Sequence, residues 1–274
     1  MVSPSAFSEA GFATSLKARC DEVRGLYLED GIPWVVGYSG GKDSSAALQL
    51  VWLAIRELPA AERTKTVHVI STDTLVEQPL VAAWVDASLV RMSTAAGEQG
   101  LPFVPHKLTP EVENTFWVNL IGKGYPAPRN KFRWCTERLK IMPSNKFIRD
   151  VVRANGEAIL VLGTRKAESQ RRAITMSKHE SKRVRERLAP NASLPNSLVY
   201  TPIEDWNNDD VWLFLMQIKN PWGTTTSRSW GCTRGRPRAA SAHWSSIPRP
   251  RAVGPAGSAA GSARSSIRTG RWRP

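Results

Sequence analysis

The sequence predicts an α/β fold in which helices cover both faces of a parallel sheet. Short apolar runs that suit buried strands alternate along the chain with longer segments whose apolar residues keep helical spacing. Parallel strands need crossover connections, which helices usually supply, and such sheets are covered on both faces. Ligands of these sheets bind beyond the carboxyl ends of the strands, so the residues that follow each expected strand are the first candidates for a site.

The expected elements follow one another from the N-terminal end of the chain. The helix expected at 79–99 has a clear stop at Gly100 and Pro102, and the third strand is the weakest of the four. The expected strands span 32–38, 66–71, 103–106 and 158–162, and the expected helices span 7–29, 45–55 and 79–99.

The most informative segment is the turn between the first strand and the next helix. Glycine lets the backbone approach an oxyanion without a Cβ clash. The first N–H groups of a helix have no intrahelical partner, and the helix dipole adds positive charge there. The turn therefore predicts a phosphate site, although its spacing is too short for a Walker A loop. It consists of Ser39, Gly40, Gly41, Lys42, Asp43 and Ser44.

Three further groups of polar residues follow expected strands or lie near them. Asp73 follows the second strand, where its carboxylate would orient a ribose or a metal-bound water, or else cap the next helix. Gly163 and Arg165 follow the fourth strand. Together with Arg171 and Arg172, Arg165 offers guanidinium groups that match phosphates, or else forms a solvated basic face. Because strand ends meet at one edge, these groups are expected in one crevice.

The motifs together resemble one superfamily. The segment 39–44 resembles the PP-loop of ATP pyrophosphatases and of phosphoadenosine-phosphosulfate (PAPS) reductases, so the fold expected is that of PP-loop adenine-nucleotide α-hydrolases. Segments 163–172 and 202–212 resemble further motifs of the PAPS reductases. Segment 133–140, which contains Cys135, and segment 220–223 are most similar to the DndC family, the sulfurtransferases of bacterial DNA phosphorothioation.

The resemblance implies a reaction and its cofactors. ATP would activate a DNA backbone phosphate as an adenylate, and sulfur would then displace AMP. The family implies ATP, Mg²⁺ and a [4Fe–4S] cluster, and as partners DNA and other phosphorothioation proteins, including a cysteine desulfurase. The residues implied in catalysis are Asp43, Cys135 and Arg165, with Asp43 able to hold Mg²⁺ and Cys135 an iron–sulfur ligand. The residues implied in nucleotide binding are Ser39, Gly40, Gly41, Lys42, Asp43, Ser44, Asp73, Gly163, Arg165 and Arg172.

Two other functions stay open. One is a PAPS or adenylylsulfate reductase in which Cys135 takes part as a thiol. The other is a non-catalytic protein that binds nucleic acid through an Arg-rich tail. Residues 165–187, with nine Lys or Arg and three Glu, are either a solvated loop or a segment that contacts DNA phosphates.

The charge of the chain is concentrated near its C-terminal end. The formal net charge is +14, but residues 224–274 contain ten Arg and no Asp, Glu or Lys, so residues 1–223 carry only +4. We therefore expect a PP-loop domain over 1–223 and a disordered tail over 224–274. No apolar run reaches the ~18–20 residues of a membrane span, and no signal pattern opens the chain, so a cytoplasmic protein that does not bind membranes is expected.

The cysteines are too few for the implied cluster, which needs four ligands. Cys135 lies among cations, which stabilise a thiolate, whereas Cys20 lies in an expected helix and is assigned a structural role. The third is Cys232, in a tail that lacks Leu entirely. The tail is either a genuine basic arm or, in our hypothesis, a frameshift product, because the frame one base upstream permits a C-x-x-C over 257–264. The nucleotide sequence across the codons for Gly223 and Thr224 decides between the two.

Two groups of aromatic residues carry weaker expectations. Trp206 and Trp212 are expected to pack in the core or at a helix start rather than to stack on a base. The four histidines have no common spacing that indicates a metal site.

Overall fold

The computed structural model of the chain describes residues 4–129, 132–181, 183–185 and 187–223. The expectations for residues 224–274, both disorder and an altered reading frame, lie outside these residues. Within the part described, no helix is long and apolar enough to cross a membrane.

A six-stranded sheet forms the centre of the fold. Its strand order is β3-β2-β1-β4-β6-β5, with parallel pairing everywhere except between β6 and β5. Strands β2 and β3 lie on one side of β1, and β4 lies on its other side, so the strand order switches between β1 and β4. Ligands of such sheets bind at this switch point. The strands are β1 (Trp34–Gly37), β2 (Val67–Thr72), β3 (Phe103–Leu108), β4 (Ala158–Val161), β5 (Ala189–Pro190) and β6 (Ser197–Tyr200).

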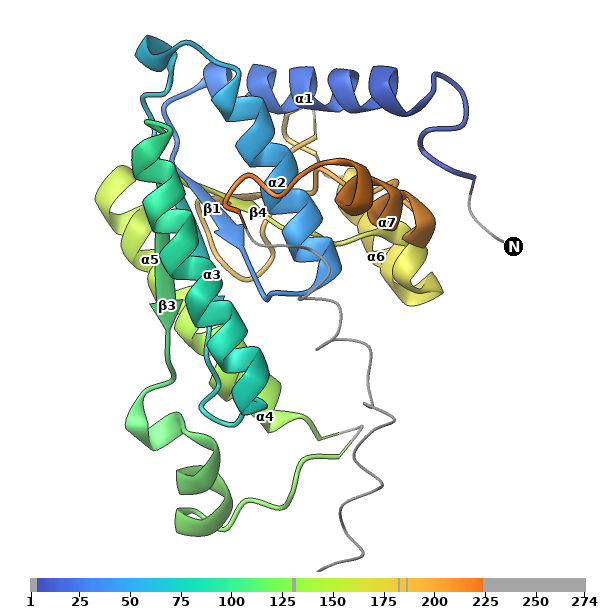
Figure 1. Cartoon of the computed structure of the whole chain (residues 1–274). Coiled ribbons are helices and arrows are strands. Elements are labelled where there is room, and N and C mark those ends of the chain that lie inside the picture. Colours follow the sequence, from blue (N-terminus) through green and yellow to red (C-terminus); the bar gives the residue numbers. More distant parts are fainter. Residues whose placement is uncertain (1–3, 130–131, 182, 186, 224–274) are drawn as a thin grey trace, which may run out of the picture. The chain divides into compact units, whose positions relative to one another are not determined.

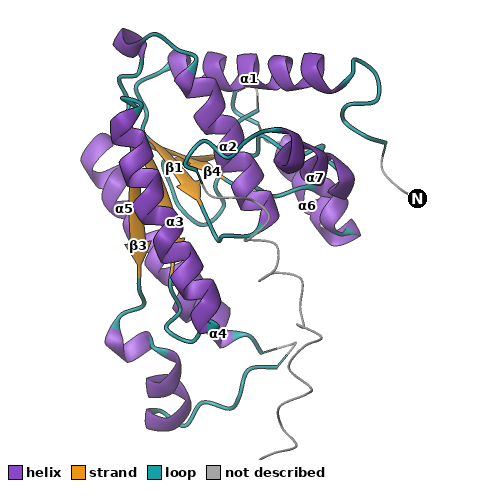
Figure 2. Cartoon of the chain, viewed as in Figure 1, coloured by secondary structure: helices purple, strands orange, loops and turns teal. Residues whose placement is uncertain are grey.

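The helices connect the strands and supply the covering layers (Figures 1 and 2). The α-helices are α1 (Phe12–Glu29), α2 (Lys42–Arg56), α3 (Pro79–Glu98), α4 (Trp134–Thr136), α5 (Met142–Asn155), α6 (Gln170–Glu180) and α7 (Asn208–Gln217). The shorter turns of 3₁₀ or π helix are η1 (Ala60–Glu62), η2 (Val112–Asn114), η3 (Val118–Gly122), η4 (Glu137–Ile141) and η5 (Lys166–Glu168).

Alternate residues of the central strands bury on opposite faces of the sheet. Trp34 and Val36 join one hydrophobic cluster with residues of α1, α2, α3 and α7, whereas Val35 joins a second cluster with Ile148 and Val151 of α5. This alternation follows from the two-residue period of a strand. The expected fold class, a largely parallel sheet with helices on both faces, is confirmed, with one antiparallel strand added at the edge.

The boundaries differ from the expected ones for local reasons. Helix α1 begins at Phe12 rather than at residue 7, because Gly11 precedes it with a φ of 79°, which interrupts helical geometry. Strand β1 begins only at Trp34, after Pro33, which has no N–H to donate to a neighbouring strand. Strand β3 runs two residues beyond His106, because it stays paired with β2 as far as Leu108.

Candidate functional site

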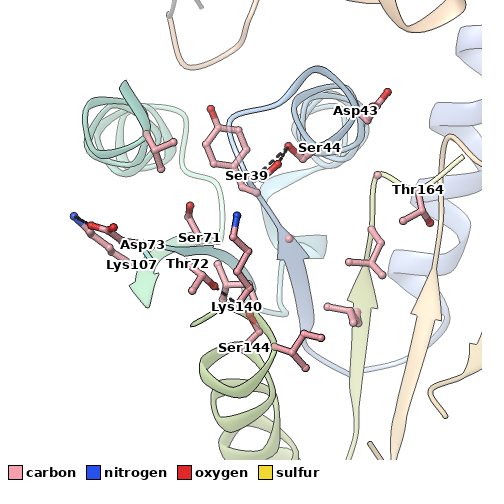
Figure 3. A pocket seen from close by; sticks show the side chains of 18 of the residues that line it. Ser39, Asp43, Ser44, Ser71, Thr72, Asp73, Lys107, Lys140, Ser144 and Thr164 are labelled. Carbon is pink, nitrogen blue, oxygen red and sulfur yellow. Dashed lines mark hydrogen bonds and ion pairs between the residues drawn. The ribbon is translucent and has the colours of Figure 1, made fainter. Parts of the chain in front are cut away.

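A cavity of about 570 Å³ lies at the carboxyl ends of β1, β2 and β4 (Figure 3). This volume is within the range of small-molecule sites. The cavity brings together residues from all three expected strand ends. Its lining includes Ser39, Asp43, Ser44, Asp73, Gly163, Thr164 and Arg172, besides several residues that the sequence did not single out.

Hydrogen bonds within the turn hold segment 39–44 in shape. Ser44 Oγ donates to the carbonyl of Gly41 at 3.0 Å and accepts the backbone N–H of Ser39 at 3.2 Å. The hydroxyls of Ser39 and Ser44 are 3.1 Å apart (Figure 3). Gly40 has a φ of 72°, a conformation that favours glycine. The first turn of α2, which starts at Lys42, therefore presents its N–H groups beside the cavity.

Gly163 permits the close approach of the β4 loop to this turn. A Cβ on Gly163 would lie 2.5 Å from the carbonyl oxygen of Asp43 and 2.8 Å from the nitrogen of Ser44. Both contacts are to backbone, which cannot rotate away as a side chain can. The glycine of the expected 163–172 motif is thus required by packing against the 39–44 turn.

Asp43 and Arg165 form an ion pair across this junction. Arg165 Nε lies 2.7 Å from Asp43 Oδ1, and Arg165 Nη1 donates to the carbonyl of Trp206 at 3.2 Å. Lys42 Nζ also contacts both oxygens of Asp43, at 2.8 and 2.9 Å. Arg165 is only 3% exposed. It therefore fixes the start of α2 against the β4 loop and is not among the residues that line the cavity within the part described.

Asp73 lies at the opposite end of the cavity, beside Lys107 (Figure 3). Asp73 Oδ1 accepts the N–H of Leu75 at 2.8 Å, and Oδ2 is 3.0 Å from Lys107 Nζ. Burial alone would raise the pKa of Asp73, but these two contacts outweigh it and hold the pKa below its ordinary value. Asp73 does not cap the next helix, because the N-cap of α3 is Gln78.

The sequence analysis did not predict Lys107, Lys140 or Ser144, which also line the cavity. Lys107 Nζ also contacts both carboxylate oxygens of Asp86 at 2.8 and 2.9 Å, and its bonds to Asp86 and Asp73 raise its pKa. Ser144 Oγ and Thr72 Oγ1 lie 3.1 Å apart, and Lys140 points into the cavity beside them (Figure 3). Lys107 was not recognised because the third strand was expected to end at residue 106, whereas β3 continues through Leu108.

The arginines of the 163–172 segment take different positions. Arg172 lines the cavity and pairs with Glu168 at 3.1 Å, whereas Arg171 is exposed and does not line it within the described residues. Glu168 also accepts the backbone N–H of Arg165, at 3.3 Å. Of the three guanidinium groups expected to face phosphate, only that of Arg172 therefore reaches the cavity.

Most of the basic run 165–187 is already paired with carboxylates. Arg183 and Arg187 contact Glu204, and Lys166 contacts Glu180 and Asp205. Arg185 pairs with Asp30 near the end of α1. Since Arg165 and Arg172 are paired too, the run joins α1, α2 and the segment after β6. It is neither wholly solvated nor wholly available to an anion.

Cys135 lies outside the cavity as the described residues define it. It is a partly buried residue of α4, from which the chain continues through η4 to Lys140 on the cavity wall. The other described cysteine, Cys20, is buried in α1, and burial raises its pKa to about 11, which suits its expected structural role. In the part of the chain that is described, no three His, Cys, Asp or Glu residues gather as they would around a metal ion.

Two other expectations concern aromatic and histidine residues. Trp206 is buried and packs edge to face with Phe7 and Phe214, so its expected core role is confirmed. His68 and His106, which the spacing did not connect, face each other across β2 and β3 with ring nitrogens 3.0 Å apart.

The cavity has more carboxylates than cations. Five acidic residues line it (Asp43, Asp73, Glu77, Asp86 and Glu168), against three basic ones (Lys107, Lys140 and Arg172). A polyphosphate entering this site would add further negative charge. A divalent cation that binds both carboxylates and phosphate oxygens would offset it, and Mg²⁺ has this ligand preference. The donor set therefore fits Mg²⁺ that enters with a nucleotide.

Comparisons with solved structures identify several α/β enzymes as similar. A PAPS reductase of Candida auris in a phosphate complex has a TM-score of 0.44 and 12% identity, with 75% of this chain and 86% of that chain covered. The U34-tRNA thiolase NcsA of Methanococcus maripaludis, with its [4Fe–4S] cluster, has a TM-score of 0.47 and 16% identity, covering 84% and 77%. An NAD⁺ synthetase of Burkholderia pseudomallei has a TM-score of 0.45 and 14% identity, covering 81% and 83%.

A curated relative and a family model match by sequence. The relative is the uncharacterised protein MJ0066 of Methanocaldococcus jannaschii, 26% identical over 200 residues. The match covers 73% of this chain but 35% of the relative, so the chain spans about a third of that protein's length. The model of the phosphoadenosine phosphosulfate reductase domain matches residues 33–222, which include every strand of the sheet and the whole lining of the cavity. The chain belongs to the phosphoadenosine phosphosulfate reductase domain family.

Proposed function

We propose that the chain is an ATP-dependent sulfurtransferase that activates a DNA backbone phosphate for sulfur incorporation. The observation that carries the proposal is the convergence of the 39–44 turn, Asp73 and the 163–172 segment on one cavity. The DNA substrate rests on the similarity of segments 133–140 and 220–223 to the DndC family. The first of these segments leads directly into Lys140 on the cavity wall.

The proposed reaction has two displacements. An oxygen of the DNA phosphate attacks the α-phosphorus of ATP, and pyrophosphate leaves with the bonding electrons. The terminal sulfur of a persulfide then attacks the activated DNA phosphorus, and AMP leaves. A thiol reduces the remaining S–S bond and releases the phosphorothioate. A cysteine desulfurase is the proposed source of the persulfide.

The residues of the cavity have separate roles in this scheme. The N–H groups of the 39–44 turn and the side chains of Ser39 and Ser44 stabilise charge on the transferring phosphates. The guanidinium of Arg172, on the cavity lining, offsets negative charge on a phosphate oxygen. Arg165 acts indirectly by holding Asp43 and the start of α2 in place. Lys107 orients Asp73 toward the ribose.

The two implied cofactors differ in how well this chain suits them. Asp43 would hold Mg²⁺, which supplies Lewis-acid polarisation of phosphate oxygens when bound. A [4Fe–4S] cluster needs four ligands, commonly thiolates. Cys20 and Cys135 are the cysteines within the described residues, and Cys232 lies outside them. The donors do not fit the cluster, and the scheme contains no step through it.

Product analysis tests the proposal. We expect purified protein with ATP and Mg²⁺ to release pyrophosphate in proportion to added DNA and to form no sulfite from PAPS. Asp43→Asn should abolish this release, whereas Asp150→Asn, which changes an exposed surface pair on α5, should leave it unchanged. Sulfite formation from PAPS with a thiol reductant, without pyrophosphate from ATP, would instead establish a reductase.

The reductase is the second candidate because the matching family model is that of the PAPS reductase domain. The third possibility, a non-catalytic nucleic-acid-binding protein, depends on residues 224–274, which lie outside the described part. It predicts DNA affinity that disappears when those residues are removed, with no turnover of ATP.

A further inference from the structure

A second cavity of about 300 Å³ adjoins the first. It lies between α6 and the β5–β6 edge of the sheet, and it shares Leu162, Thr164 and Arg172 with the lining of the first cavity. The shared residues follow β4, at the carboxyl edge where the phosphate-binding turn also lies. A group bound in the second cavity would therefore be next to a phosphate held at the turn.

The lining of the second cavity has more cations than carboxylates, with three arginines against Glu180 and Glu204, so its charge favours an oxyanion. Three guanidinium groups reach it, those of Arg172, Arg183 and Arg187. A guanidinium forms paired hydrogen bonds with two oxygens of a phosphate, which a Lys ammonium does not. Further polar side chains in the lining are Thr164, Asn191 and Ser193. The hydroxyls of Thr175 and Thr201, also in the lining, already donate to the carbonyl of Arg171 and to Glu204.

A buried carboxylate holds two of these guanidinium groups in position. Glu204 is 3% exposed, and both of its oxygens accept from Arg183 Nη2, at 2.8 and 3.0 Å. Arg187 Nη1 donates to the same carboxylate. A guanidinium has five N–H donors on three nitrogens, and the bonds of Arg183 to Glu204 use one nitrogen. Glu204 therefore fixes the orientation of Arg183 and leaves donors for a ligand.

We propose that the second cavity binds a phosphodiester of single-stranded DNA, adjacent to the phosphate that reacts in the first cavity, with Arg172 between the two. The proposal rests on the proposed function and names where its DNA substrate binds. The volume is at the lower end for a ligand site, so one nucleotide unit fits and a duplex does not. A strand must therefore be unpaired to enter, as in enzymes that extrude their target nucleotide.

A matched pair of variants at Ser193 tests the site. Ser193 is exposed on the cavity lining, and a carboxylate there repels an anion without removing any arginine. The probe is dithymidine monophosphate, because its single phosphodiester gains little from the Arg-rich residues 224–274. Its affinity is measured by ³¹P NMR titration of the full chain in the presence of AMP.

We expect Ser193→Glu to weaken dithymidine monophosphate binding about tenfold, which corresponds to ~1.4 kcal/mol, because the added carboxylate repels the phosphodiester. Ser193→Gln, of equal size but neutral, should bind it within about twofold of the unchanged chain, and ATP affinity should change less than about twofold in both. Thr175→Glu and Thr175→Gln repeat the test on the α6 wall, should the Ser193 variants fold poorly.

Different results overturn the two proposals. Equal dithymidine monophosphate affinity in Ser193→Glu and Ser193→Gln, or no binding to the unchanged chain, overturns the second site whatever the pyrophosphate assay gives. A diribonucleotide that binds about tenfold more tightly than its DNA counterpart overturns the assignment to DNA. If the charge-dependent binding is found but DNA elicits no pyrophosphate, the site stands and the sulfurtransferase proposal fails.

Discussion

Single residues at the junction of α2 and the loop after β4 determine the geometry of the 39–44 turn. The most constrained is Gly163, because its missing side chain leaves the space that the backbone of Asp43 occupies. This constraint is separate from any contact with a ligand. A substitution at Gly163 should therefore change both stability and nucleotide binding.

We expect Gly163→Ala to lower the free energy of unfolding by about 1–3 kcal/mol, the usual cost of overpacking. ATP affinity should fall at least about tenfold, because the turn must move. The control is Gly25→Ala, within α1, where an added Cβ meets nothing within 4 Å. It should raise stability by about 0.5–1 kcal/mol, since alanine favours a helix. Urea unfolding and calorimetric titration with ATP measure both quantities, and unchanged ATP affinity in Gly163→Ala would contradict the packing argument.

The Arg165–Asp43 pair makes a second prediction at this scale. Arg165→Met leaves Asp43 with Lys42 alone and removes the donor to the carbonyl of Trp206, so we expect a loss of about 2 kcal/mol. Arg153→Met, which breaks an exposed pair with Asp150 on α5, should cost less than about 0.5 kcal/mol. Urea denaturation midpoints, compared at constant m-value, measure the loss of unfolding free energy in each variant. Equal losses would show that the Arg165–Asp43 pair contributes no more than an exposed ion pair.

For single residues, the sequence predicted which positions lie at the strand ends better than it predicted which side chains contact one another. The 39–44 turn, Asp73 and Gly163 were found because each follows a strand whose apolar run is clear. Lys107 was missed because the third strand is weakly apolar and its true end lies beyond His106. Arg165 was expected at a phosphate but faces a carboxylate, and no local pattern in the sequence encodes that partner, which lies 122 positions away.

Among the secondary-structure elements, α5 and strands β2 and β3 enclose an unusual histidine pair. His68 of β2 and His106 of β3 face each other, and the ring of Phe147 from α5 lies 4.7 Å from that of His106. Burial lowers the pKa of both histidines below its ordinary value, and the charge of His106 lowers that of His68 further. Both rings therefore take up a proton at a lower pH in the folded chain than they would in the unfolded chain.

This arrangement makes stability depend on pH in one direction. The unfolded chain has ordinary histidines with a pKa of about 6.5, so below that pH it binds more protons than the folded chain. The contribution of the pair to stability is thus complete above about pH 6.5 and is lost as the pH falls.

We expect the unfolding free energy in urea to fall more between about pH 7.5 and pH 5.5 in the unchanged chain than in the double variant His68→Gln/His106→Gln. The double variant is the control because it keeps two polar side chains and all other titrating groups. Equal pH dependence in the two chains would mean that the buried pair does not contribute.

Helix α5 and strands β5 and β6 were not predicted from the sequence, for two different reasons. Helix α5 has Pro143 in its first turn, where proline is tolerated but resembles a break in a linear pattern. Strand β6 is four residues long and β5 only two, too short for an alternating pattern to be distinguished from a loop. The two short strands are therefore specified by their partners in the sheet rather than by their own composition.

For the whole molecule, the boundary expected near residue 223 can be judged by the packing that precedes it. Trp222 is 3% exposed, and its ring lies 5.5 Å from that of Trp52 and 6.4 Å from that of Tyr38. Gln99 Nε2 donates to the carbonyl of Pro221 at 2.9 Å. The segment 220–223 therefore closes one side of the core formed by α2 and α3.

We expect a chain of residues 1–223 to unfold with a free energy within about 0.5 kcal/mol of the full chain and to keep its ATP affinity, because the cavity and the core lie before that point. A chain of residues 1–219 should lose about 3–5 kcal/mol, the cost of removing a buried Trp, and Trp222→Ala in the 1–223 chain should reproduce most of that loss. Urea unfolding of the four proteins measures these differences. A 1–223 chain as unstable as the 1–219 chain would contradict the proposed boundary, because residues beyond Gly223 would then belong to the folded core.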